Sequence, residues 1–248
     1  MFGNHFYHAT TRKAVALFGT IFNNISVIRQ DGSGNVLNQI KVPLAYGPKQ
    51  KFLSRLDSIT GQDATMAIKL PRMGFEITSM DIDSTQKLAK RNQIVENHAT
   101  DSTKKKTIKQ AVAYNINMSL FAMAKNQDDG LQIMEQILPY FQPEYTVTIN
   151  PVTGFDYKQD VPIILNAVTI QDDYEGDFQT RRALIYQFDF VMKMKYFGPT
   201  ADQGVIREIN LDFNADPGGA NILENMDFTI TPSSADEDDN YTVNVSIT

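Results

Sequence analysis

The sequence predicts an α+β protein, with a mixed, mostly antiparallel β-sheet and short helices packed on it. Three observations lead to this class. Residues 112–123 and residues 184–196 each alternate apolar and polar side chains, as half-buried strands do. Residues 127–143, which lie between them, repeat apolar side chains at helical spacing. Because an apolar helix stripe needs an apolar sheet face, we expect the flanking strands to provide that face.

Composition narrows the class of protein further. The chain has 248 residues, of which 42% are apolar, so it can build one large domain or two small ones. Its net charge of −6 argues against a general nucleic-acid-binding protein. Cysteine is absent, which excludes disulfides, thiolate metal sites and a cysteine nucleophile. No transmembrane helix or signal peptide is recognisable, so we expect a soluble protein that is used without export.

The N-terminal part is predicted to form a helix followed by a hairpin. Thr10 or Thr11 can cap a helix that runs to about residue 23. Residues 25–30 and 36–42 then alternate as strands. The sequence Asp-Gly-Ser-Gly-Asn between them is a strong turn signal, so the two strands should pair with each other.

A short helix, two extended stretches and a long polar segment follow. Residues 50–59 are predicted to be helical, with a buried face made of Phe52, Leu53 and Leu56. Residues 66–70 and 74–81 should be extended. Residues 82–110 are rich in lysine and too polar to form core. This segment is therefore either a long solvent-facing hairpin or a polar arm that orders only against another subunit.

The helix at residues 127–143 has marked ends. Asp128 and Asp129 are N-cap candidates and place negative charge at the positive end of the helix dipole. Pro139 should loosen the helix, and Pro143 should end the segment. The apolar stripe predicted to be buried consists of Leu131, Met134, Ile137, Leu138 and Phe141.

Strands dominate the rest of the chain. Residues 145–149 form one strand candidate, and residues 163–170, which are apolar on both faces, suit a central strand. The clearest candidate is residues 184–196. Because this strand is long and its second face is mostly polar, we expect it either to line a solvent-exposed surface or to extend beyond its own domain. Residues 205–213 and 241–247 are weaker candidates. The last of these has no neighbouring partner in the sequence, so it invites pairing with another sheet edge, such as one in a neighbouring chain.

These elements predict two parts of the chain. Residues 1–200 form the α+β domain, which contains the polar arm or long hairpin of residues 82–110. Residues 201–248 form a C-terminal extension that ends in the unpartnered strand.

No catalytic, cofactor-binding or metal-binding site is predicted. The three histidines offer no complete set of metal ligands: His5, His8 and His98. The acidic run at residues 236–239 lacks the ligand spacing of a calcium loop. A second acidic cluster stands close to two arginines and is explained by local ion pairing: Asp172, Asp173, Glu175 and Asp177 with Arg181 and Arg182. Phosphate-binding loops and nucleophile elbows are missing too, so the sequence favours a protein that is not an enzyme.

Several short blocks of sequence carry a resemblance to a known family. The densest is QIMEQILPYFQP at residues 132–143. The others, in order and with similar spacing, are residues 1–3, Phe6, Tyr7, residues 17–19, residues 22–25, Arg29, Gln30, Val42, Pro43, Tyr46, Lys49, Phe52, residues 70–72, Arg181, Arg182, the phenylalanine-rich strand at residues 184–196, Ile206, Arg207, Asp212 and Phe213. Together they resemble the tail sheath stabiliser, or tail completion, family of T-even-type contractile-tailed bacteriophages. The resemblance runs from residue 1 to about residue 215.

This resemblance implies a structural protein with a tail-terminator-like fold, extended arms and no known activity. Family membership implies a homohexameric ring at the head-proximal end of the tail. The ring ends the growth of the tail tube and the tail sheath, and offers a docking surface to the head completion proteins of the neck. Its implied partners are therefore the tube protein, the sheath protein and the neck proteins, and its implied place is the virion, after assembly in the host cytoplasm. DNA is implied to pass through the ring without tight binding, which the net charge of −6 suits.

Two alternatives remain at this point. A subunit of the tube, the baseplate or a neck adaptor would need the same β-rich ring architecture. A soluble binding module or an enzyme with an unrecognised site would instead show a deep polar pocket.

Overall fold

The structure is a computed structural model that describes residues 5–57, 70–86, 89, 91–97, 104–173, 183–204, 206, 208–215, 222–233, 235 and 240–248. The chain divides into two compact units. The major unit comprises Tyr7–Leu88 and Ala111–Tyr196, and the minor unit comprises Met1–Phe6, Ala89–Gln110 and Phe197–Thr248. The described fold is rich in strands and has three short α-helices, which agrees with the predicted α+β class.

All three helices belong to the major unit, and each was predicted. They are α1 (Thr10–Phe22), α2 (Lys49–Asp57) and α3 (Gln127–Ile137), and a 3₁₀ turn, η3 (Leu138–Tyr140), extends α3 as Pro139 predicts. The predicted caps were wrong. Ala9, in the left-handed conformation, precedes α1, and Asn126 precedes α3, in both cases without a side-chain cap hydrogen bond. Asp128 and Asp129 instead lie in the first turn of α3, where their charge still favours the helix dipole.

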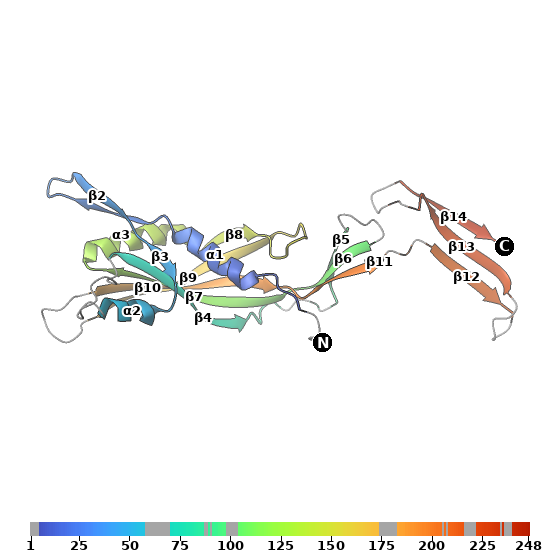
Figure 1. Ribbon diagram of the computed structural model, residues 1–248, viewed down its shortest axis with the longest axis horizontal. Helices are drawn as coiled ribbons and strands as arrows, with labels where there is room; N and C mark the ends of the chain where they lie inside the picture. The colour runs from blue at the N-terminus through green and yellow to red at the C-terminus, as the bar shows by residue number, and fades with distance from the viewer. Residues whose placement is uncertain are drawn as a thin grey trace. The chain divides into compact units, whose positions relative to one another are not determined.

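A six-stranded sheet forms the body of the major unit (Figure 1). Its spatial order is β3-β4-β7-β10-β9-β8, and all pairs are antiparallel except β3 with β4. The strands are β3 (Leu44–Tyr46), β4 (Arg72–Ile82), β7 (Val112–Ala124), β8 (Glu144–Ile149), β9 (Gln159–Asp173) and β10 (Ala183–Tyr196). The prediction of a mixed, mostly antiparallel sheet is confirmed. The strand predicted to be central, β9, is an interior strand that pairs with β10 on one side and β8 on the other.

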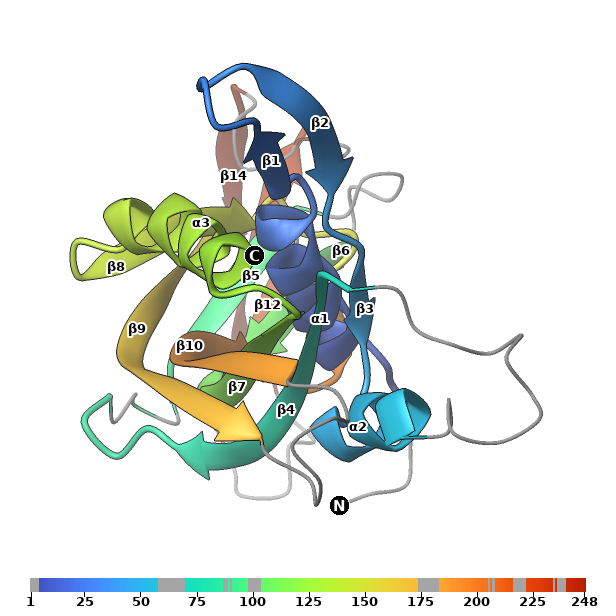
Figure 2. The ribbon, with the colours of Figure 1, turned by 90° about the vertical axis from the view of Figure 1, so that its left-hand side faces the viewer.

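The hairpin of β1 (Ser26–Gln30) and β2 (Val36–Lys41) pairs as predicted and forms a separate two-stranded sheet. Helices α1 and α3 lie on one side of the curved six-stranded sheet (Figure 2). Their side chains share the main apolar cluster with alternate residues of β7 and β10. Helix α2 covers part of the other side, where its Phe52 meets Phe121, Met123 and Ile185. The sheet is thus buried on both faces at one end, so β7 is not half-buried throughout as its alternation predicts.

The buried face of α3 also differs from the predicted stripe. Ile133 and Ile137 are its most buried apolar residues, while Leu131, Met134 and Phe141 pack around them. Leu138 is exposed, because the 3₁₀ turn after α3 directs it away from the cluster. Val112, the first apolar residue of the alternation in β7, is exposed at the start of that strand.

The minor unit contains two three-stranded sheets. One has the order β11-β6-β5 and is built from β5 (Gln93–Asn97), β6 (Lys104–Lys109) and β11 (Thr200–Gly204). The other has the order β12-β13-β14 and is built from β12 (Glu208–Asn214), β13 (Ile222–Thr231) and β14 (Thr242–Ile247). The prediction that the C-terminal strand lacks a partner was wrong, because β14 pairs with β13, a strand that was not predicted from the sequence. Strand β11 was missed too, and the extended stretch expected at residues 66–70 lies, except for Leu70, outside the described residues.

Candidate assembly surfaces

The described residues contain no group of three or more His, Asp or Glu side chains that could hold a metal ion. His5 is exposed and His8 half-buried ahead of α1. His98 and the acidic run at residues 236–239 lie outside the described residues, as do residues 174–182 with their two arginines. None of the described helices is long and apolar enough to cross a bilayer.

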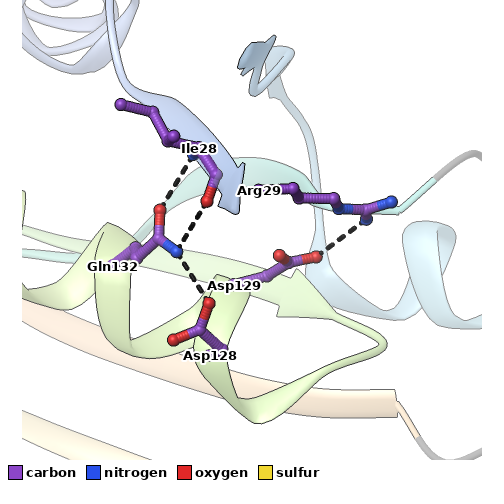
Figure 3. Close-up of polar contacts among 5 residues, drawn as sticks. All are labelled: Ile28, Arg29, Asp128, Asp129 and Gln132. Atoms are coloured by element: carbon purple, nitrogen blue, oxygen red, sulfur yellow. Dashed lines mark hydrogen bonds and ion pairs between the residues drawn. The ribbon is translucent and has the colours of Figure 1, made fainter. Parts of the chain in front are cut away.

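The most specific polar arrangement is the junction between the hairpin and α3 (Figure 3). It joins β1, which contains Arg29, to α3, which contains Gln132, although about a hundred residues separate the two elements in the chain. Arg29 of β1 forms an ion pair of 3.1 Å with Asp129, whose side chain is only 3% exposed. Asp129 stands in the first turn of α3, so the helix dipole and the guanidinium both stabilise its charge.

Two glutamines of α3 replace a missing strand along the outer edge of β1. Gln132 Oε1 accepts from the Ile28 N–H at 2.9 Å, and its Nε2 donates to the Ile28 carbonyl, also at 2.9 Å. One helical turn later, Gln136 makes the same two contacts with the N–H and carbonyl of Ser26, at 3.4 Å and 2.8 Å. Each amide thus satisfies both backbone groups of one residue, as a neighbouring strand would. This edge of the hairpin is closed to further strand pairing.

The other edge of the hairpin has no such cover among the described residues. Because Ser26 and Ile28 direct their backbone groups away from β2, their partners across the pair, Lys41 and Gln39, direct theirs away from β1. No strand in the described part of the chain pairs with this side of β2. Near the turn, Val36 and Leu37 are 59% and 69% exposed. The hairpin therefore presents an open backbone edge and exposed apolar side chains on a firmly anchored base.

Replacing Gln132 by glutamate tests this anchorage. The variant loses both donor contacts of Nε2, to the Ile28 carbonyl and to Asp128 Oδ2, and places a carboxylate beside those acceptors. We expect Gln132→Glu to lower the free energy of unfolding by about 1–2 kcal/mol and to speed hydrogen exchange at the Ile28 amide. Glu135→Gln, on the exposed side of the same helix, is the matched control and should change stability by less than about 0.5 kcal/mol. Equal exchange at Ile28 in both variants would contradict the anchoring role.

A polar cavity of about 290 Å³ lies elsewhere in the major unit. Its lining includes three carboxylates and two lysines: Asp83, Glu144, Asp160, Lys193 and Lys195. Gln159, also in the lining, is 3% exposed, and neither polar atom of its amide has a hydrogen-bond partner among the described residues. Charges of both signs suit polar groups of a partner better than an apolar ligand. The residues that line the cavity include no histidine, and no group of three or more acids that could hold a metal ion is found among the described residues.

Asp83 is the buried charge of this cavity. The Thr85 hydroxyl donates to Asp83 Oδ1 at 2.5 Å, the Thr85 N–H donates to the same oxygen at 3.1 Å, and Lys193 Nζ lies 4.0 Å from Oδ2. The Thr85 hydroxyl, and to a lesser degree the Thr85 N–H and Lys193, lower the pKa of Asp83 below its usual 3.8, against the opposing effect of burial.

A lowered pKa makes the ionised form of Asp83 a stabilising group. Its contribution is complete above the unfolded-state pKa near 3.8 and is lost as the pH falls through the lower pKa of the folded state. We therefore expect Asp83→Asn to be less stable than the wild type at pH 6, and the difference to shrink towards pH 3. Denaturant unfolding of both proteins at these two values checks this. If the difference in the free energy of unfolding between the two proteins stayed constant or grew on acidification, the lowered pKa of Asp83 would be contradicted.

Two comparisons relate the chain to known proteins. The model of the T4-like virus Myoviridae tail sheath stabiliser family matches residues 5–248. The chain is also 30% identical to the tail completion protein gp15 of Enterobacteria phage T4 over 251 residues, covering 96% of this chain and 90% of that protein. The family match thus continues to the end of the chain, and the limit near residue 215 drawn from the sequence blocks was wrong. The chain therefore belongs to the T4-like Myoviridae tail sheath stabiliser family, whose members are structural proteins of the phage tail.

Proposed function

We propose that this protein completes the phage tail as a homohexameric ring at its head-proximal end. The ring ends the growth of the tail tube and the tail sheath, and then offers the docking surface for the neck of the head. The observation that carries the proposal is the family match over residues 5–248, together with the identity to a tail completion protein over nearly the whole chain. The number six comes from the family resemblance. The isolated ring should therefore have six times the 27.9 kDa mass of one chain.

The surfaces of the chain support an assembly role in preference to a catalytic one. The hairpin is fixed to α3 by an ion pair and two glutamine amides, yet its β2 edge and the side chains of Val36 and Leu37 are open. A rigid element with an open edge suits contact with another protein chain by strand addition. The family name points to the sheath as one partner, and the tube and neck proteins complete the proposed set.

DNA is proposed to pass through the ring without tight binding. The net charge of −6 is compatible with a channel lined by acidic or neutral residues, which would make few phosphate contacts. Any binding to duplex DNA should therefore be weak and should fall steeply with added salt.

The proposal is tested by assembling tails in the host from the phage genes with and without this chain. With this chain present, we expect tails of uniform length that join filled heads. Without it, tubes and sheaths should vary in length, and the tails should fail to join heads. Adding back the purified wild type or the Thr20→Ala variant, which alters only an exposed residue of α1, should restore joining equally. Tails of normal length that join heads in the absence of the chain would overturn the proposal.

A further inference from the structure

The C-terminal sheet of the minor unit has one side that is almost entirely apolar. Its residues pair in rows across the three strands, such as Ile209–Phe228–Val245 and Leu211–Met226–Ile247. We call the apolar face the set of Ile209, Leu211, Phe213, Met226, Phe228, Ile230, Val243, Val245 and Ile247. Glu224, opposite Phe213, lies at its edge. In these rows the intervening residues point to the other side, and all of them are Asn, Asp, Ser or Thr.

The apolar face is exposed. On the two outer strands, its six side chains keep 43–56% of their surface: Ile209, Leu211, Phe213, Val243, Val245 and Ile247. No described residue of this sheet is buried, and none belongs to an apolar cluster of the fold. A sheet with one apolar side normally buries that side against a second layer. Contiguous apolar surface of this kind marks a contact with another chain.

Charge indicates which chain covers the face. The C-terminal segment, residues 208–248, contains nine of the 29 acidic residues and no lysine or arginine. The other 20 acidic residues and all 23 basic ones lie in the N-terminal segment, residues 1–207, which has a net charge of +3. Two C-terminal sheets placed face to face would bring two segments of charge −9 together, which is unfavourable. The N-terminal segment of another copy has the opposite sign and attracts the C-terminal segment.

The size of the face points in the same direction. Three strands about 4.8 Å apart, each with three side chains that repeat about every 6.8 Å, give a footprint on the order of 300 Å². A stable isolated pair of proteins usually buries about 800 Å² on each partner. The face is therefore too small to hold a dimer alone, but it suits a contact that is repeated around a closed assembly, in which each copy presents its apolar face to one neighbour and its N-terminal segment to the other.

We propose that the apolar face of each copy is covered by a second copy of this chain, through a head-to-tail contact with the partner's N-terminal segment. This inference rests on the proposed ring, since the footprint requires a closed assembly. The acidic C-terminal segment attracts the partner, and burial of the nine apolar side chains then holds it. The contact is heterologous, so it propagates from copy to copy until the ring closes.

Photo-crosslinking in assembled tails tests this directly. A photoreactive amino acid is placed at Leu211, on the apolar face, or at its neighbour Asn210, which points to the opposite side of the same strand. From position 211 we expect a covalent dimer with twice the 27.9 kDa mass of the chain, and the crosslinked peptide should come from the N-terminal segment of the second copy. Position 210 should give at least tenfold less of this dimer. Heavy-isotope labelling of half the copies separates links between copies from links within one chain.

Several outcomes would overturn the inference. They are a product with a different tail protein, a crosslink to the C-terminal segment of a second copy, a link within one chain, or equal dimer yields from positions 210 and 211. Substitutions give a second readout: Val245→Lys should reduce incorporation into tails at least tenfold, whereas Ser246→Lys, on the polar side, should not. If the chain caps the tail but crosslinks to another protein, the inference fails and the proposed function stands. If it self-crosslinks away from the tail end, the proposed function fails.

Discussion

Phe18→Ala should cost about 3–5 kcal/mol of the free energy of unfolding, the largest loss that we expect from a single substitution. Phe18 is fully buried in the middle of α1. Its ring lies 4.9 Å from that of Phe22, 5.1 Å from that of Phe75 and 5.3 Å from that of Phe190, so it joins α1 to both β4 and β10. Truncation removes the buried area and leaves a cavity that these rings cannot fill without moving.

Urea unfolding of the major unit measures this loss. Thr20→Ala, on the exposed side of the same helix, is the control and should change stability by less than about 0.5 kcal/mol. A loss of less than about 1 kcal/mol in Phe18→Ala would show that α1 does not pack on the sheet as described.

Gly130→Ala should destabilise the protein by about 1–3 kcal/mol, although alanine is the better helix former by about 1 kcal/mol. Gly130 lies inside α3, and a Cβ atom at this position would overlap the buried ring of Tyr186 on β10. Because that ring is enclosed by the main cluster, it cannot turn away, and the helix must shift instead.

The sign of this effect makes the test sharp, since propensity and packing predict opposite results. Gly32→Ala in the hairpin turn, where an added Cβ meets nothing within 4 Å, is the control and should be close to neutral. An increase in the unfolding midpoint of Gly130→Ala, measured by thermal or urea denaturation, would contradict the close packing of α3 on β10.

The elements with strong periodicity were predictable from the sequence. The alternation in residues 184–196 predicts β10, and the apolar spacing in residues 127–143 predicts α3, because both signals depend only on which side faces the core. The buried face of α3 was displaced from the predicted stripe because contact is closest at Gly130, a residue without a side chain. Ile133, one turn later, therefore becomes a centre of the contact, which hydrophobicity alone does not reveal.

The polar junction and the complete C-terminal sheet were not predicted, for different reasons, although the strand candidates at residues 205–213 and 241–247 correspond to β12 and β14. Glutamines that take the place of a strand leave no pattern in a single sequence, since Gln132 and Gln136 look like ordinary helix-surface residues. In β13, which spans residues 222–231, Glu224 occupies a position where the alternation calls for an apolar side chain. This interruption made the strand hard to recognise from the sequence. Because β13 was not predicted, the terminal strand β14 was expected to lack a partner. The alternation of Met226, Phe228 and Ile230 is nevertheless a sequence signal for β13.

The proposed function requires six copies of this protein to form one ring at the head-proximal end of the tail. The chain has no cysteine, so Ser33→Cys in the exposed hairpin turn gives a unique attachment site for a gold or electron-dense label. Electron microscopy of purified, labelled tails then reports the position, symmetry and number of copies together. We predict a single six-fold ring of label at the head-proximal end of every tail. Label along the whole tube, label at the opposite end, or a ring with a different number of copies would contradict the proposed function.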